Sequence, residues 1–367
     1  MNELDRSTFI KRCLQTGVGL SLYTSLSGEV FAASEGSKEE MKKEKAAKYV
    51  FNFGSPYKTS ESKTTPHAHQ AIKSIVEKRT NNKVYVKIHD AGSAGIGSSL
   101  SNAVKFGTVQ GALLSVSNLS PMAKELDVLN IPFWSSNTVP YVNVFTSDVF
   151  HKHVLAQISK FKIQVLFPYI VGARTATSTK KYGKTIKALA DFEGIKFRIP
   201  GSKSLKNFYK ISKAKPVTIA WKLTAKNARG GRFDALDSSI AGLYAGPDGL
   251  RKSLGVISTI ASVHDGWVAI GNSDFVNKMD PTTKKEFLQA MDEVQKEQVA
   301  LQKKAEDFSV AEFAKLGTKV YRPTPAEVKA LSSTLGHTHN SWIPIKKRLF
   351  GKNGVAIFDS LYKAANG

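Results

Sequence analysis

The stretch that decides the fold lies between residues 49 and 116, where three short apolar runs read YVFNFG (49–54), VYVKI (84–88) and ALLSV (112–116). Residues 66–79 between the first two runs carry Ala, Ile and Val at helical spacing. A Gly/Ser-rich loop at 91–99 then leads into a second helical segment that ends near Phe106. Strand–helix–strand alternation predicts an α/β fold built on a parallel sheet with crossover helices.

The same pattern recurs further along the chain. Strands are predicted at 163–167, 195–200, 235–239 and from 262 to 270, with a helix at 203–210. A chain of 367 residues exceeds one compact core, so two lobes are expected. The second α/β lobe follows the first, and the late strands are expected to return to the first lobe.

Residues 281–316 predict one long helix. Asp280 suits the N-cap, Pro281 suits the first helical position, and Gly317 is a natural stop. At 1.5 Å per residue the helix would measure about 54 Å, which exceeds one small lobe. It is expected either to brace both lobes or to pair with a second copy of the chain, so a monomer and a homodimer both remain open. A break near Ser309 is the alternative.

The N-terminal residues predict export. Arg6, Lys11 and Arg12 precede an apolar stretch too short to cross a bilayer, and Val30-Phe31-Ala32 supplies small residues where a signal peptidase cuts. The start resembles a twin-arginine motif in which Ser7 replaces the second arginine. We therefore expect an export signal at 1–32, a charged, mobile leader at 33–46 and a periplasmic location. A cytosolic amphipathic first helix is the alternative.

Composition limits the classes of function. The net charge is +23, but the lysines are spread along the chain and no nucleic-acid-binding motif accompanies them, which favours a solvated basic surface. The single cysteine, Cys13, lies in the predicted signal, so no disulfide or thiolate site is expected. Motifs of nucleophilic, zinc-dependent and dinucleotide-dependent enzymes are missing, which predicts a protein that is not an enzyme. A periplasmic enzyme acting on a small anion and a basic protein that binds nucleic acid or the cell envelope are the alternatives.

Metal and cofactor sites are not expected. Three His-x-His pairs occur, at 67/69, 151/153 and 337/339, but no further ligand stands at matched spacing. The first two pairs fall in segments of helical pattern, where such side chains diverge.

Arg198 is the most informative single residue. It stands late in the apolar run 195–200, so its side chain cannot easily avoid the interior, and a buried arginine needs a carboxylate partner. Ligands of open α/β sheets bind at the carboxyl ends of strands, where Arg198 is placed. Its guanidinium would grip a carboxylate by two parallel hydrogen bonds. An internal salt bridge is the alternative.

From Tyr49 to Val320 the chain resembles the TRAP-transporter substrate-binding proteins. Residues 191–200 (DFEGIKFRIP) are similar to that family's Asp-Leu-x-Gly-x-Lys-x-Arg-x-Pro motif. Segments 129–134 (LNIPFW), 172–174 (GAR) and 231–235 (GRFDA) resemble three further family segments. Two elements differ: Leu223 stands where many members have Glu, and Asp237-Ser238 stand where some have Glu-Trp, which argues against a family-type metal site.

The resemblance implies a two-lobed periplasmic-binding-protein-like fold with the long helix spanning both lobes. Lobe I is expected at 47–170 plus about 260–300, lobe II at 171–259 plus about 301–345, and a C-terminal tail at 346–367. The protein would bind a small organic carboxylate and deliver it to a TRAP membrane permease. Arg198 would clamp the carboxylate and Arg174 would neutralise or orient it. The other ligand-binding residues expected are Ser55, Lys58, Trp134, Trp221, Asp234 and Ser238, with Phe133 as a further wall of the cleft.

Overall fold

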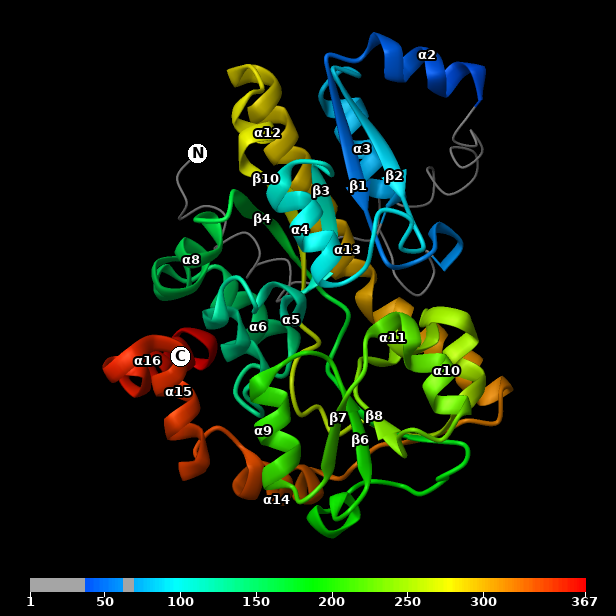
Figure 1. Cartoon of the computed structure of the whole chain (residues 1–367), viewed down its shortest axis with the longest axis vertical. Coiled ribbons are helices and arrows are strands. Elements are labelled where there is room, and N and C mark those ends of the chain that lie inside the picture. Colours follow the sequence, from blue (N-terminus) through cyan, green and yellow to red (C-terminus); the bar gives the residue numbers. More distant parts are fainter. Residues whose placement is uncertain (1–36, 62–68) are drawn as a thin grey trace.

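The computed structural model describes residues 37–61 and 69–367, which form two β-sheets arranged one above the other in Figure 1. The upper sheet has five strands in the order β2-β1-β3-β10-β4, and the lower sheet has six in the order β11-β9-β5-β8-β6-β7. Helices pack around both sheets, as predicted for an α/β fold.

The strands predicted at 49–54, 84–88, 112–116 and 163–167 are confirmed as four of the five strands of the upper sheet. The strands of this sheet are β1 (Tyr49–Gly54), β2 (Val84–His89), β3 (Gly111–Ser115), β4 (Ile163–Tyr169) and β10 (Trp267–Asn272). β2 and β3 pair in parallel with β1, whereas β10 runs antiparallel to both β3 and β4. The sheet is therefore mixed, because β10 arrives directly from the other sheet and not through a crossover helix. The helices that connect or flank these strands are α3 (Gln70–Arg79), α4 (Ser98–Phe106), α5 (Val116–Leu119) and α12 (Ser273–Asn277).

The lower sheet contains several strands that the sequence pattern did not predict. Its strands are β5 (Ala176–Thr179), β6 (Lys196–Ile199), β7 (Lys215–Thr218), β8 (Ala235–Leu236), β9 (Leu254–Ser258) and β11 (Lys319–Tyr321). Of these, β6 and β8 fall within the predicted runs, and β8 is only two residues long. The helices of this region are α9 (Lys203–Ile211), α10 (Thr224–Arg229), α11 (Ile240–Tyr244) and α14 (Pro325–Leu335).

Two extended segments connect the sheets and lie side by side. Residues 170–175 lead from β4 to β5, and residues 259–266 lead from β9 back to β10. Their backbones are joined by hydrogen bonds from Arg174 N to Val263 O (2.7 Å) and from Asp265 N to Gly172 O (2.9 Å). The predicted strand at 262–270 was therefore wrong in its first part: residues 262–264 belong to this connection, and β10 begins at Trp267. We call 170–175 and 259–266 the crossing segments.

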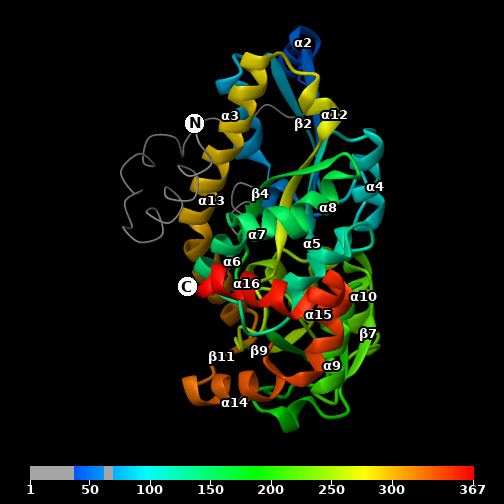
Figure 2. The same cartoon turned by 90° about the vertical axis from the view of Figure 1, so that its left-hand side faces the viewer.

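The predicted long helix is α13 (Pro281–Lys315), which runs 35 residues without a break at Ser309 (Figure 2). The Asp280 side chain accepts a hydrogen bond from Thr283 N at the N-cap, and Gly317 adopts the left-handed φ of +72° just past the end. α13 contacts α3 and β4 of the upper sheet and α11 and β11 of the lower sheet. The prediction that this helix spans both lobes is confirmed, whereas the residue boundaries given for the lobes stay predictions.

The leader predicted to be charged and mobile is in fact a docked helix from Lys38 onward. Helix α2 (Lys38–Ala46) carries Glu40, which is buried against the upper sheet. The Glu40 carboxylate pairs with Lys73 of α3 at 2.8 Å and accepts a hydrogen bond from the Tyr85 hydroxyl of β2 at 3.0 Å. The prediction rested on charge density alone, and it was wrong because these charges find partners in the fold.

The C-terminal residues are helical as well and do not form a tail. Helices α15 (Ile343–Phe350) and α16 (Gly354–Asn366) follow α14, and α16 packs on α6 (Thr138–Phe145). Phe358 of α16 also packs on Trp134, which precedes α6, with ring centroids 5.0 Å apart. The remaining short helices are α7 (Asp148–Phe150), the π-helical turn η3 (His151–Leu155), α8 (Ala156–Ser159), and the 3-10 turns η1 (Thr59–Glu61), η2 (Lys124–Asn130), η4 (Leu189–Phe192), η5 (Trp221–Leu223), η6 (Pro247–Ser253), η7 (Asn340–Trp342) and η8 (Gly351–Asn353).

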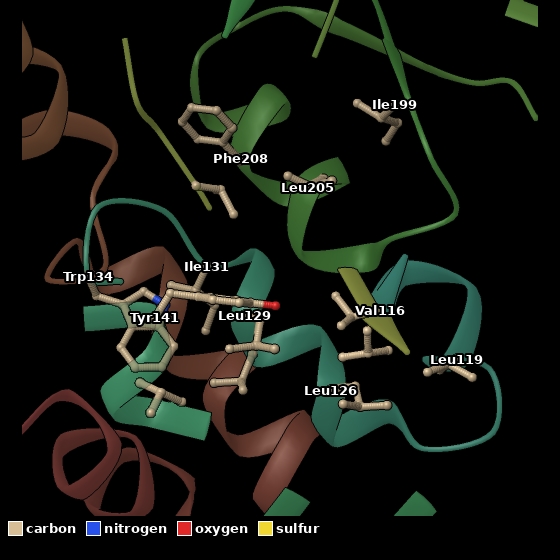
Figure 3. Packing of buried hydrophobic residues seen from close by; sticks show 14 of the residues in the cluster. Val116, Leu119, Leu126, Leu129, Ile131, Trp134, Tyr141, Ile199, Leu205 and Phe208 are labelled. Atoms are coloured by element: carbon tan, nitrogen blue, oxygen red, sulfur yellow. The ribbon is translucent and has the colours of Figure 1, made fainter. Parts of the chain in front are cut away.

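The largest hydrophobic core joins the region after β3 to the lower sheet. Figure 3 shows Leu205 and Phe208 of α9 facing Leu129 and Ile131, which lie in and just after η2. The LNIPFW segment singled out in the sequence therefore serves packing.

Replacing Glu40 by Gln is expected to lower the free energy of unfolding by about 2 kcal/mol at pH 7, because a buried acid with two lysine partners loses its charge. Burial raises the pKa of Glu40, but the hydrogen bonds from Lys73, Lys43 and Tyr85 outweigh it and hold the pKa below the usual 4.5. The charge therefore stabilises the fold above pH 4.5, and this contribution is lost as the pH falls through the lowered pKa. Urea denaturation of both proteins at pH 7 and pH 3 measures the difference, which should shrink at the lower pH.

Glu39→Gln is the matched control, since Glu39 is exposed on the same helix. Equal stabilities of the Glu40→Gln protein and the wild type at pH 7 would mean that α2 does not dock as described.

Candidate ligand-binding cleft

A cavity of about 730 Å³ opens between the two sheets. Its walls come from the segments that follow β1, β2 and β3 in the upper sheet and β6, β7 and β8 in the lower sheet. Within each sheet these three strands run parallel to one another, so their carboxyl ends converge on the cavity, where open α/β sheets bind ligands. Both crossing segments also contribute, through Arg174 and Asp265.

Arg198 lines this cavity from the carboxyl half of β6 and is 3% exposed. Its Nε and one terminal nitrogen donate hydrogen bonds to the Ile219 carbonyl at 2.9 and 2.7 Å. The guanidinium carbon lies 5.3 Å from the centroid of the Trp221 ring, a cation–π distance. Among residues 37–61 and 69–367, no acidic side chain forms an ion pair with Arg198. The internal salt bridge considered as the alternative is therefore not formed within the described chain.

Burial lowers the pKa of Arg198 to about 10, with Asp237 opposing the shift and Arg174 adding to it. The guanidinium is still a cation at neutral pH. It is a buried positive charge that a carbonyl oxygen and an aromatic face only partly compensate.

Arg174 is buried as well, but unlike Arg198 it forms ion pairs with two aspartates. Its two terminal nitrogens lie 3.1 Å from Asp237 Oδ1 and 2.8 Å from Asp265 Oδ1. Burial lowers the pKa of Arg174, but Asp265 and Asp237 outweigh it and raise the pKa above its usual value. Arg174 therefore lines the cavity as part of a cluster that supplies its own counter-charges.

Asp265 has both carboxylate oxygens occupied. Oδ1 accepts from the Trp267 indole at 3.2 Å in addition to Arg174, and Oδ2 accepts from Ser238 Oγ at 2.7 Å and Ser239 N at 3.0 Å. Asp265 thus joins the two crossing segments to the end of β8.

The predicted site residues divide into two groups. Arg198, Arg174, Trp221 and Ser238 line the cavity, although the hydroxyl of Ser238 is committed to Asp265. The four others do not line it: Ser55, Lys58, Trp134 and Asp234.

Each of these four has another position in the structure. Ser55 is fully buried and accepts a hydrogen bond from Tyr57 N, and Lys58 is exposed. Trp134 packs on Phe358, as described above. Asp234 accepts from Lys196 N at 2.8 Å, which places it at the amino end of β6, away from the cleft.

Phe133, the further expected wall, packs against Phe208 of the core with ring centroids 6.3 Å apart. The family-like motifs around Trp134 and Asp234 therefore support the fold and not the cavity.

Sequence reasoning missed part of the cavity wall. Ile96 comes from the Gly-rich loop after β2, Ser98 from the start of α4, and Trp267 from the start of β10. The place of the loop directly after a parallel strand was the signal that could have assigned it to the cleft.

A metal-binding cluster of three or more His, Cys, Asp or Glu side chains does not occur in the described parts of the chain. The same residues include no helix with the length and apolar character needed to cross a bilayer. The predicted signal at 1–32 lies outside the described residues.

Several solved structures have the same fold. A TRAP periplasmic solute-binding protein from Bordetella bronchispeptica, with density assigned to pantoate, is 18% identical and matches with a TM-score of 0.75 over 86% of this chain and 99% of its own. One from Desulfovibrio salexigens with bound orotic acid is 17% identical, with a TM-score of 0.75 over 86% and 99%. One from Ralstonia eutropha H16 with bound (S)-2-acetolactate is 20% identical, with a TM-score of 0.73 over 86% and 98%.

The sequence itself matches the family model described as bacterial extracellular solute-binding protein, family 7 (DctP). The match covers residues 56–343, which is most of the chain and includes most of both sheets and all of α13. The family expected from the sequence motifs is thereby confirmed, and its members are binding proteins and not enzymes. This chain belongs to the bacterial extracellular solute-binding proteins of family 7.

Proposed function

We propose that this protein binds a small organic carboxylate in the cleft between its sheets and delivers it to a TRAP-type membrane permease. The observation that carries the proposal is Arg198, a buried cation on the cavity wall without an acidic partner in the described chain. A buried guanidinium without a direct ion pair is costly, and a bound carboxylate would supply that direct partner.

The geometry of Arg198 suits a carboxylate. The Ile219 carbonyl occupies the Nε side of the guanidinium, and this leaves N–H groups on both terminal nitrogens. Two parallel hydrogen bonds from those nitrogens would match the two carboxylate oxygens. Trp221 and the Ile219 carbonyl would hold the guanidinium in place before the ligand arrives.

The relatives' ligands support this proposal. The three proteins compared above contain density assigned to pantoate, bound orotic acid and bound (S)-2-acetolactate, and each of these molecules has a carboxyl group. Their low sequence identity shows only the common fold, so the nature of this chain's ligand rests on its own residues.

Capture is proposed to close the cleft. The two sheets are connected by the crossing segments and α13, an arrangement that permits hinge motion. A closed, ligand-loaded form would differ in surface from the open form, which gives a permease a basis for recognition. Export to the periplasm and the choice between monomer and homodimer through α13 stay predictions.

Arg198→Ala is expected to weaken carboxylate binding by about 2–5 kcal/mol, roughly 30-fold to several thousand-fold in Kd. Arg198→Lys should also bind weakly, since an ammonium cannot form the forked contact. The melting temperature without ligand should stay close to the wild-type value, because the substitution breaks no ion pair. Calorimetric titration with a panel of organic acids, beside a melting curve, measures both. A folded Arg198→Ala protein with wild-type affinity would end the carboxylate-clamp hypothesis.

Asp265→Ala, in contrast, should lower the stability of the fold. It leaves Arg174 with a single acidic partner inside the protein, so we expect a loss of about 3–5 kcal/mol of unfolding free energy. Asp274→Ala is the control, because the Lys162–Asp274 pair is exposed and worth less than about 1 kcal/mol. Urea denaturation compares the two, and equal small losses would mean that the buried cluster does not stabilise the connection between the sheets.

The export proposal is tested by the N-terminus of protein made from the full gene in a bacterial host. We expect periplasmic protein that begins near Ala33, because cleavage after Val30-Phe31-Ala32 fits a signal peptidase. Cytosolic protein that retains Met1 would contradict it.

A further inference from the structure

Four serine hydroxyls on the cavity wall are hydrogen-bonded within the protein. Ser115 Oγ accepts from Ser117 N at 3.4 Å, and Ser117 Oγ accepts from Asn130 at 3.2 Å. Ser99 Oγ donates to the Ile96 carbonyl at 2.9 Å, and Ser238 Oγ donates to Asp265 at 2.7 Å. Ser99 and Ser238 have thus committed their hydroxyl hydrogens to protein acceptors, so a ligand hydroxyl could accept from them only if those bonds broke.

The cavity wall offers one buried cation, Arg198, as a direct partner for a ligand carboxylate. Asp237 and Asp265 are both paired with Arg174, so these three groups carry one net negative charge. Arg198 balances that charge across the cluster but has no direct acidic contact. The remaining cation, Lys222, is exposed at the rim, where solvent screens it. A second carboxylate would therefore lie near two buried aspartates without a buried cation of its own.

Much of the remaining wall is apolar. Ile96 and Leu114 contribute from the upper sheet's side, Ile219, Trp221 and Leu223 from the lower sheet's side, and Trp267 from the start of β10. Leu223 is unusual because 49% of its surface is exposed, although it is a large hydrophobic residue beside Trp221 at the cavity. An apolar ligand surface would cover it.

We propose that the ligand is a monocarboxylate with an apolar body, either a branched chain or an aromatic ring. Arg198 binds the carboxylate, while Trp221, Leu223 and Ile96 contact the hydrocarbon. The cavity of about 730 Å³ has room for such a body, since pockets of about 300–1,000 Å³ hold drug-sized ligands. This inference rests on the proposed function and specifies the class of ligand for the same site.

The test is calorimetric titration of the full mature chain with four probes: 4-methylpentanoate, phenylacetate, succinate and D-glucuronate. At least one of the two apolar monocarboxylates should bind at least about tenfold more tightly than succinate and glucuronate, whose extra polar groups would be desolvated against the apolar residues of the wall. Arg198→Ala should weaken the binding of the preferred probe by at least about 30-fold.

Leu223→Gln should weaken the preferred probe about fivefold to tenfold, because a covered apolar side chain is replaced by a polar one. Its melting temperature without ligand should not change, since Leu223 is a surface residue. Val139→Gln is the matched control: Val139 is 47% exposed but does not line the cavity, and the substitution should leave affinity unchanged.

The outcomes separate this inference from the proposed function. Tightest binding of succinate or glucuronate, lost in Arg198→Ala, would overturn the apolar-body inference and leave a carboxylate receptor. Unchanged affinity for the preferred monocarboxylate in Leu223→Gln would also overturn it. Absence of binding by all four probes, and by a wider panel of organic acids, would overturn the proposed function together with this inference.

Discussion

One buried ion cluster determines how the two halves of this protein are joined. Arg174 and Asp265 stand on the two crossing segments, and Asp237 stands at the end of β8 in the lower sheet. The two ion pairs at 3.1 and 2.8 Å tie these three segments together at the base of the cavity. Because none of the three groups can reach bulk water easily, removal of one exposes the others to the cost of an uncompensated buried charge. The cluster therefore holds the base of the cleft in place, and the residues above it depend on that position.

The same ion cluster explains why Arg198 has no direct acidic partner. Both arginines are buried in the same cavity, but the available aspartates are committed to Arg174, and Asp265 in addition binds Ser238, Ser239 and Trp267. The protein thus separates a structural guanidinium from one that is available to a ligand. Burial lowers the pKa of Arg198 to about 10, a sign that the free protein tolerates an unfavourable charge there. Such a local cost is typical of binding sites, where stability is reduced in favour of affinity.

Long, regular elements could be predicted from the sequence, whereas short or irregular ones could not. β1 and β2 show clear apolar patterns, and α13 is bounded by Asp280, Pro281 and Gly317. β5 escaped prediction because it is composed of Ala, Thr and Ser and is fully buried despite its polarity. β7 contains Pro216, which is tolerated because β7 lies at the edge of the lower sheet.

Within the site, the clearest sequence signal belonged to one residue, Arg198. Arg198 stood out as a charge within an apolar strand, and its place on the cavity wall follows from the strand that carries it. Asp265 and Trp267 could not be found in this way, because their role depends on a crossing segment that meets Arg174 across about ninety positions of sequence. Ser55 was expected in the cleft from its place after a strand and Asp234 from a family-like segment, but their side chains accept hydrogen bonds from the backbone N–H groups of Tyr57 and Lys196. A residue's position along the chain indicates which strand end its backbone lies near, whereas the contacts of its side chain depend on the tertiary structure.

The long helix is hydrogen-bonded to the crossing segment that carries Arg174. Gln298 lies at the middle of α13, is fully buried, and exchanges hydrogen bonds with both the N–H and the carbonyl of Ile170 at the start of a crossing segment. A buried amide in the middle of a largely apolar helix face is costly unless both of its ends are satisfied, and here the backbone of the crossing segment satisfies them. α13 is therefore bonded to the connection between the sheets as well as packed on each of them. Because the same crossing segment carries Arg174, the helix, the ion cluster and the wall of the cleft form one continuous structure, and any movement of one sheet relative to the other must act on all three together.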